Sequence, residues 1–287
     1  MVKVTVNPNQ PVSVSIVSDK INNRVCSGTA VTFTATGLNG GLSPSYTWRV
    51  NSAIAGNNSS TFTSSTLTHS DTVRVQLTSN ATYCISGSPA ASNSIVMEVD
   101  SLPQIRSQNA VCVGSSVQLT ASTDPFAGTD TWVIGNDELA LVEPAGSTVT
   151  ITGLSTGVTT LSYTDINGCT NTIPFTVNTS VSAPDTILGV QELCGRYSLQ
   201  SGYTDTLYYQ VTPVAGASSY DWQPSDRSIR IVSGFGTHRV GVIADSTLTS
   251  NFGLGRLYVS TLSAGGCTSD YISLRLYRTK PYVNRVT

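Results

Sequence analysis

The chain has 287 residues, a formal net charge of −2 and only 11% charged residues. So few cationic groups exclude nucleic acid and an anionic membrane surface as expected partners, because both require a basic face. No run of about 18 apolar residues occurs, so no segment is expected to insert into a membrane.

The chain opens on an alternating segment, in which Val2, Val4 and Val6 predict the buried face of a strand. Similar segments precede proline-marked linkers at 95–99, 173–177 and 272–276. We therefore expect residues 1–9 to be the tail strand of a preceding repeat plus a linker. No signal peptide is visible, so Met1 is interpreted as an added start and the chain as a piece of a longer protein.

One cysteine, one tryptophan and one cysteine recur three times among short alternating strands. The three sets are Cys26, Trp48 and Cys84; Cys112, Trp132 and Cys169; Cys194, Trp222 and Cys267. This spacing is typical of an immunoglobulin-like β-sandwich, in which the tryptophan fills the core between two sheets. The sequence therefore predicts an all-β protein of three tandem sandwiches in an elongated array, over residues 10–100, 101–179 and 180–287.

The strand pattern supports that division. Predicted strands lie near 12–18, 30–36, 45–50, 60–66, 72–79 and 93–99 in the first sandwich, and near 104–110, 116–121, 130–134, 147–152, 158–164 and 172–177 in the second. In the third, the first cysteine precedes its strand at 207–211 by a longer gap, which indicates an insertion between Gly195 and Thr206. No amphipathic helix of useful length is expected.

Six cysteines can pair in 15 ways, and the repeat favours a bond within each sandwich: Cys26–Cys84, Cys112–Cys169 and Cys194–Cys267. Each cysteine flanks a strand, so each bond is expected to clip one end of its sandwich. Such bonds are worth about 4 kcal/mol each and indicate an extracellular setting. The alternative is six reduced thiols in a cytosolic protein.

Particular segments resemble a known group of repeats. Cys26-Ser-Gly-Thr-Ala-Val-Thr-Phe-Thr-Ala, Tyr46-Thr-Trp-Arg-Val-Asn and Ala215-Gly-Ala-Ser-Ser-Tyr-Asp-Trp are similar to PKD-like repeats of Bacteroidota surface proteins, including gliding-motility adhesins exported by type IX secretion. Cys112-Val-Gly with Gly153-Leu-Ser-Thr-Gly resembles the bacterial Ig-like repeats found beside them. The Trp-Asp-Phe-Gly-Asp-Gly motif of classical PKD repeats and the C-terminal sorting domain of the family are both missing.

No catalytic constellation emerges. The two histidines, His69 and His238, lie in different predicted sandwiches, no Gly-x-Ser-x-Gly motif supports a nucleophile, and no carboxylate pair stands out. The chain is therefore predicted not to be an enzyme and to need no cofactor. Calcium is the one cation considered, because Asp124, Asp130 and Asp137 crowd turns of the second sandwich, although solvated loops explain them as well.

Two sets of surface candidates follow. Tyr197 and Tyr203 lie in the insertion of the third sandwich, where exposed tyrosines suit contacts with sugar or protein. Five triplets are similar to the O-glycosylation acceptor of Bacteroidota, with Thr72, Ser101, Thr186, Thr206 and Ser246 as acceptors.

The first hypothesis is a non-catalytic stalk or spacer segment of a large secreted cell-surface adhesin, active in adhesion or gliding, whose partners are neighbouring repeats of the same chain. The second is a module that binds a surface polysaccharide or a host or surface protein through its third sandwich. The third is an accessory array of a secreted multidomain enzyme.

Overall fold

The computed structural model describes residues 8–106, 108–122, 130–191, 206–227, 229–244 and 253–277. The chain divides into two compact units. One comprises Met1–Ile105, Ala121–Thr131 and Ser162–Thr172, and the other comprises Arg106–Thr120, Trp132–Leu161 and Ile173–Thr287. The described elements are strands, apart from the short 3-10 helix η1 (Ile21–Asn23). Within these ranges, no helix has both the length and the apolarity needed to cross a bilayer.

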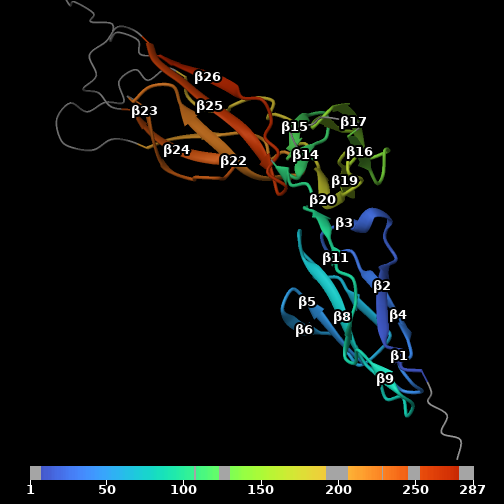
Figure 1. Cartoon of the computed structure of the whole chain (residues 1–287). Helices are drawn as coiled ribbons and strands as arrows, with labels where there is room; N and C mark the ends of the chain where they lie inside the picture. Colours follow the sequence, from blue (N-terminus) through green and yellow to red (C-terminus); the bar gives the residue numbers. More distant parts are fainter. Residues whose placement is uncertain are drawn as a thin grey trace, which may run out of the picture. The chain divides into compact units, whose positions relative to one another are not determined.

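The first sandwich is built from two sheets and two short parallel pairs (Figure 1). One sheet contains β2 (Ser13–Ser18), β4 (Val31–Leu38) and β7 (Thr61–Ser64). The other contains β10 (Ala90–Ala91), β8 (Thr72–Thr78), β5 (Ser45–Val50) and β6 (Ala53–Ala55), and β11 (Ile95–Val96) also pairs with β8. The parallel pairs are β1 (Gln10–Pro11) with β9 (Ile85–Ser86), and β3 (Arg24–Cys26) with β12 (Glu98–Asp100).

Strict alternation explains why these segments form half-buried strands. Along β8, Val73, Val75 and Leu77 are buried while the residues between them face outward. Because successive side chains point to opposite faces of a sheet, a single register buries all three. That register places Trp48 of β5 opposite Val75.

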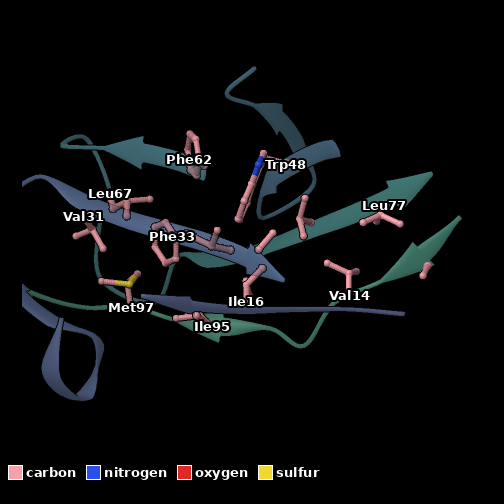
Figure 2. Packing of buried hydrophobic residues seen from close by; sticks show 14 of the residues in the cluster. Val14, Ile16, Val31, Phe33, Trp48, Phe62, Leu67, Leu77, Ile95 and Met97 are labelled. Atoms are coloured by element: carbon pink, nitrogen blue, oxygen red, sulfur yellow. The ribbon is translucent and has the colours of Figure 1, made fainter. Parts of the chain in front are cut away.

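Trp48 lies at the centre of the first core, as Figure 2 shows. Its indole lies 5.6 Å from the ring of Phe62 and 6.4 Å from the ring of Phe33, centroid to centroid. The indole N–H donates a 2.8 Å hydrogen bond to the Ser59 carbonyl, so burial leaves no polar atom of this ring unpaired.

We expect Trp48→Ala to lower the free energy of unfolding of the first sandwich by about 3–5 kcal/mol, because it removes a fully buried ring and leaves a cavity. Val17→Ala is the matched control, since Val17 lies on β2 with its side chain facing solvent, and should change stability by less than about 0.5 kcal/mol. Chemical denaturation measures both. Equal effects of the two substitutions would contradict this packing.

The second sandwich has two four-stranded sheets. One contains β13 (Ile105–Arg106), β15 (Ser116–Ala121), β18 (Thr148–Gly153) and β17 (Ala140–Ala145), and the other contains β14 (Ala110–Cys112), β20 (Thr170–Asn178), β19 (Gly157–Thr164) and β16 (Thr131–Ile134). The sequence prediction missed β17, which contains Pro144. A proline is tolerated there because β17 pairs only with β18 and forms the edge of its sheet.

The third sandwich has two three-stranded sheets, drawn in orange and red in Figure 1. One contains β21 (Leu207–Gln210), β24 (Arg239–Ala244) and β23 (Ile229–Ser233), and the other contains β22 (Ala217–Pro224), β25 (Gly253–Ser263) and β26 (Ile272–Tyr277). Trp132 and Trp222 are buried in their sandwiches. Their indole N–H groups donate to the carbonyls of Gly146 and Thr237, at 3.0 Å and 2.8 Å.

The predicted fold class is confirmed: the protein consists of tandem β-sandwiches, with short strands and repeated buried tryptophans. The predicted tail strand falls mostly on residues 1–7 and the predicted insertion on 192–205, and both segments lie outside the described residues.

Candidate functional site

Cys26 is held at the end of β3 by two backbone features. First, β3 runs parallel to β12, which places Cys26 in register with Asp100. Second, the chain turns immediately afterwards, where the Thr29 N–H donates a 3.1 Å hydrogen bond to the Cys26 carbonyl. Gly28 occupies the turn at φ +84°, a conformation that side chains disfavour, which explains the Cys-x-Gly pattern.

Cys112 repeats this arrangement in the second sandwich. It ends β14, which is parallel to β20, and lies in register with Asn178. The Ser115 N–H donates a 3.0 Å hydrogen bond to the Cys112 carbonyl, and Gly114 adopts φ +79°. We call Cys26 and Cys112 the strand-end cysteines.

Cys169 lies in a tight turn that precedes the last strand of the second sandwich. The Asp165 N–H donates to the Cys169 carbonyl at 3.0 Å, and the Cys169 N–H donates to Asp165 Oδ1 at 2.9 Å. Gly168 supplies the positive φ of +79° that closes the turn.

Cys267 lies in an equivalent turn of the third sandwich, between β25 and β26. The Ser263 N–H donates to the Cys267 carbonyl at 2.8 Å, and the Cys267 N–H donates to Ser263 Oγ at 3.1 Å. Gly266 has φ +83°. We call Cys169 and Cys267 the turn cysteines, and both are buried.

Two disulfides join the strand-end cysteines to the turn cysteines. Cys26 bonds Cys169 with their Cα atoms 5.5 Å apart, and Cys112 bonds Cys267 with their Cα atoms 5.8 Å apart. Each bond therefore ties one sandwich to the sandwich that follows it in the sequence. This arrangement corrects the predicted pairing of Cys26 with Cys84 and of Cys112 with Cys169.

The geometry of the last strand explains why the predicted pairing is wrong. In the second sandwich, Cys169 directly precedes β20, whereas Cys112 is in register with Asn178 at the other end of β20. A strand of nine residues spans about 30 Å. A disulfide needs Cα atoms within about 7 Å, so the two cysteines of this sandwich cannot reach each other.

Polar and close contacts surround each bond. At the first junction, Arg24 donates to both carboxylate oxygens of Asp100, at 2.6 and 2.9 Å, and to Asn167 Oδ1 at 2.9 Å. Asn167 belongs to the turn that carries Cys169, so Arg24 reinforces the covalent contact with a planar fork of donors. The pair is exposed, and its electrostatic contribution is accordingly small.

At the second junction, the turn that carries Cys267 packs directly on the end of β20. A Cβ added at Gly265 would meet the Asn178 side chain at 2.6 Å, so a larger residue there would force that side chain to shift. Thr261 Oγ1 also donates a 2.7 Å hydrogen bond to the Ser182 carbonyl. The strand end and the turn thus form a fitted contact around the bond.

The remaining cysteines differ in their status. Cys84 carries no disulfide and is exposed. Cys194 lies outside the described residues. The predicted bond between Cys194 and Cys267 is wrong, because Cys267 bonds Cys112.

The structure gives the other candidate residues separate positions. Tyr197, Tyr203, Ser246 and Asp124 lie outside the described residues. Ser101 and Thr186 are exposed, Thr72 and Thr206 are half-buried, and Asp137 is exposed.

The calcium candidate Asp130 neighbours Tyr163. Burial raises the pKa of the Tyr163 hydroxyl, and the Asp130 carboxylate raises it further. Within the described ranges, no group of three potential metal ligands gathers.

A second surface candidate was missed by the sequence analysis. On the outward face of the β22–β25–β26 sheet, the Tyr271 hydroxyl donates a 2.6 Å hydrogen bond to Asp221 Oδ2. Gln223 Nε2 donates to the same oxygen at 2.6 Å, and the ring of Tyr258 meets that of Tyr271 edge to face at 6.4 Å. The bond to Asp221 raises the pKa of Tyr271. Alternation along β22 places Asp221 and Gln223 outward, but sequence alone does not pair them with Tyr271.

Family models match two regions of the chain. Residues 104–182 match the bacterial Ig-like domain (group 2), and residues 180–271 match the PKD-like domain. The protein therefore consists of tandem immunoglobulin-like β-sandwich domains. Such domains are typical of extracellular adhesion or spacer modules, and their families are generally non-catalytic.

Several solved structures align with this chain at low identity. The three N-terminal domains of the Hoc capsid protein of bacteriophage RB49 align at 13% identity over 93% of this chain and 98% of theirs, with a TM-score of 0.36. The eight N-terminal Ig domains of DSCAM align at 15% identity over 94% of this chain and 40% of theirs, with a TM-score of 0.31. Titin domains A168–A170 align at 13% identity over 93% and 99%, with a TM-score of 0.30. No curated protein matches the sequence.

Proposed function

We propose that this chain is a non-catalytic spacer segment of a large bacterial cell-surface adhesin, in which disulfides lock successive sandwiches together. The observation that carries the proposal is the repeated junction, in which a strand-end cysteine of one sandwich bonds the turn cysteine of the next. A bond that closed one sandwich on itself would protect that sandwich alone. A bond across each junction instead adds a second covalent connection beside the backbone linker, so load on the linker does not separate the two sandwiches there.

The two bonds also overlap in the sequence, since Cys112 lies within the segment that Cys26 and Cys169 enclose. Neither loop can therefore be pulled fully open while the other bond is intact. This property suits a segment that holds a distal binding domain away from a cell. The resemblance to repeats of Bacteroidota adhesins supports a bacterial surface, and O-glycosylation at the exposed Ser101 and Thr186 would be consistent with it.

A display experiment tests the spacer function. The chain is anchored to beads at one end and carries a small binding domain at the other. The beads are held on a ligand-coated surface, and their retention and the length of their tethers are followed under increasing flow. We expect a variant with Cys26→Ser, Cys169→Ser, Cys112→Ser and Cys267→Ser to bind equally at rest but to give visibly longer tethers under flow. Tethers that lengthen equally with and without the bonds would contradict the proposal.

A second candidate function is ligand binding by the third sandwich, through the surface formed by Tyr271, Tyr258, Asp221 and Gln223. The Tyr271 ring is 48% exposed and is fixed by its bond to Asp221, so it presents a preorganised face on which a sugar ring or a partner's side chain could stack. Asp221 Oδ1 and Gln223 Oε1 add acceptors beside it.

If this surface binds a glycan, Tyr271→Ala should weaken binding about tenfold or more on a glycan array, as expected for an aromatic contact at the centre of an interface. Tyr271→Phe keeps the ring and loses the bond to Asp221, so it should retain part of the affinity. Tyr208→Ala is the matched control, because Tyr208 is comparably exposed (55%) but lies on the other sheet, under Arg239. Unchanged binding in Tyr271→Ala would rule this surface out.

A further inference from the structure

Cys84 has the same place in its sandwich as the two turn cysteines have in theirs. Each of the three follows the strand that pairs with the tryptophan-bearing strand of its sandwich, namely β8, β19 or β25. Each also precedes the last strands of its sandwich. Cys169 and Cys267 are fully buried because a strand-end cysteine from the preceding sandwich covers and bonds them. Cys84 is the exposed member of this set.

The surface around Cys84 is independently shaped for a partner. A depression of about 380 Å³ is lined by Pro8, Gln10, Asn39, Tyr83 and Cys84 itself. A neighbouring depression of about 490 Å³ shares Asn39 and Tyr83 and is edged by Leu42. Leu42 is fully exposed and Tyr83 is 48% exposed, so apolar side chains and concave surface gather beside the thiol.

Backbone bonds hold this region in place. The Gln10 N–H donates a 3.0 Å hydrogen bond to the Cys84 carbonyl, and β9, which follows directly, pairs with β1. The thiol is therefore presented from a fixed segment at the sandwich end where β1 begins. In both observed junctions, the turn belongs to the later sandwich and the strand end to the earlier one.

We propose that Cys84 is a third junction cysteine, which forms a disulfide with the strand-end cysteine of an Ig-like repeat preceding it in the same polypeptide. The partner cysteine is expected to begin a Cys-x-Gly turn at the end of a strand that runs parallel to the last strand of its own repeat. Cys26-Ser27-Gly28 and Cys112-Val113-Gly114 are the two examples in this chain. This inference rests on the spacer function proposed above and extends the covalent chain by one repeat.

The chemistry is thiol–disulfide exchange with a small disulfide oxidant of the glutathione type. The Cys84 thiolate attacks the oxidant, forms a mixed disulfide and releases one thiol. The partner's thiolate then attacks Cys84 Sγ and releases the second thiol. Two protein thiols are oxidised to one disulfide, and the oxidant's disulfide is reduced to two thiols, so electrons and protons balance.

The test adds an Ig-like repeat in front of the chain. A copy of residues 103–177, with its own Cys169 changed to serine, replaces residues 1–6 of the full chain. Val177 of the copy is then followed by Asn7, as Val177 is followed by Asn178 in the chain itself. After equilibration in a glutathione redox buffer, free thiols are alkylated and disulfide-linked peptides are identified by mass spectrometry. We expect Cys84 linked to Cys112 of the copy in most molecules.

A second extended chain guards against failure of one copy to fold. It carries a copy of residues 8–99 with its Cys84 changed to serine, which offers Cys26 of the copy as the partner. Bonding to Cys84 in either chain, lost in the matched Cys84→Ser variant, supports the proposal. Full alkylation of Cys84 in both chains, with Cys26–Cys169 and Cys112–Cys267 intact, overturns it and leaves the spacer function standing.

Discussion

Pulled by its two ends in the absence of reductant, the protein should extend to about a third of its chain length. The shortest covalent path runs to Cys26, crosses to Cys169, returns along the chain to Cys112, crosses to Cys267 and continues to residue 287. This path contains roughly 100 residues and reaches about 370 Å, whereas the reduced chain reaches about 1,000 Å at about 3.6 Å per residue.

Because the two loops overlap, single-bond variants should give graded lengths. Replacing Cys26 and Cys169 by serine leaves a path of roughly 130 residues, or about 480 Å, and replacing Cys112 and Cys267 leaves roughly 145 residues, or about 520 Å. Optical tweezers measure these contour lengths. An oxidised chain that reaches the length of the reduced chain would show that the bonds do not have this connectivity.

In the oxidised protein, a single cut of the backbone should release no fragment at most positions in the chain. Every peptide bond between Cys26 and Cys267 lies inside at least one disulfide loop. Arg227 is an exposed site for trypsin between β22 and β23. After a cut there, a denaturing gel without reductant should show one species of full mass, and reductant should separate it into two.

Two controls make this experiment specific. In Cys267→Ser the loop that contains Arg227 is open, so the same cut should separate the pieces without reductant. A cut after Lys20 lies outside both loops and should release its fragment in either protein. Release of the Arg227 fragment from the unreduced wild-type protein would contradict the observed pairing.

Most of the fold could be predicted from the alternation of apolar and polar residues along the strands. Segments such as 72–79 and 116–121 have one buried face and one solvent face, so their register and strand character follow from the sequence directly. Trp48 and Trp222 mark strands that face a core, because the space between two sheets accommodates an indole, although β5 is interior to its sheet and β22 lies at the edge of its own. Strand β17 was missed because Pro144 disfavours a strand wherever both of its edges are paired, and the sequence does not reveal which strands are edges.

The disulfide pairing could not be read from the spacing of cysteines alone. Similar spacings in successive sandwiches suggested closure within each one, but the spacing does not state which end of a sandwich a cysteine occupies. That depends on β14 running parallel to β20, a long-range pairing that places Cys112 far from Cys169. The surface at Tyr271 was missed for a related reason, since its partner Asp221 lies on a non-neighbouring strand.

Peptide mapping of the unreduced protein tests the central claim most directly. Thiols are alkylated, the chain is digested and disulfide-linked peptides are sequenced by mass spectrometry. The structure predicts links between Cys26 and Cys169 and between Cys112 and Cys267, with Cys84 alkylated. Links between Cys26 and Cys84, or between Cys112 and Cys169, would place each bond within one sandwich and contradict a covalently joined series.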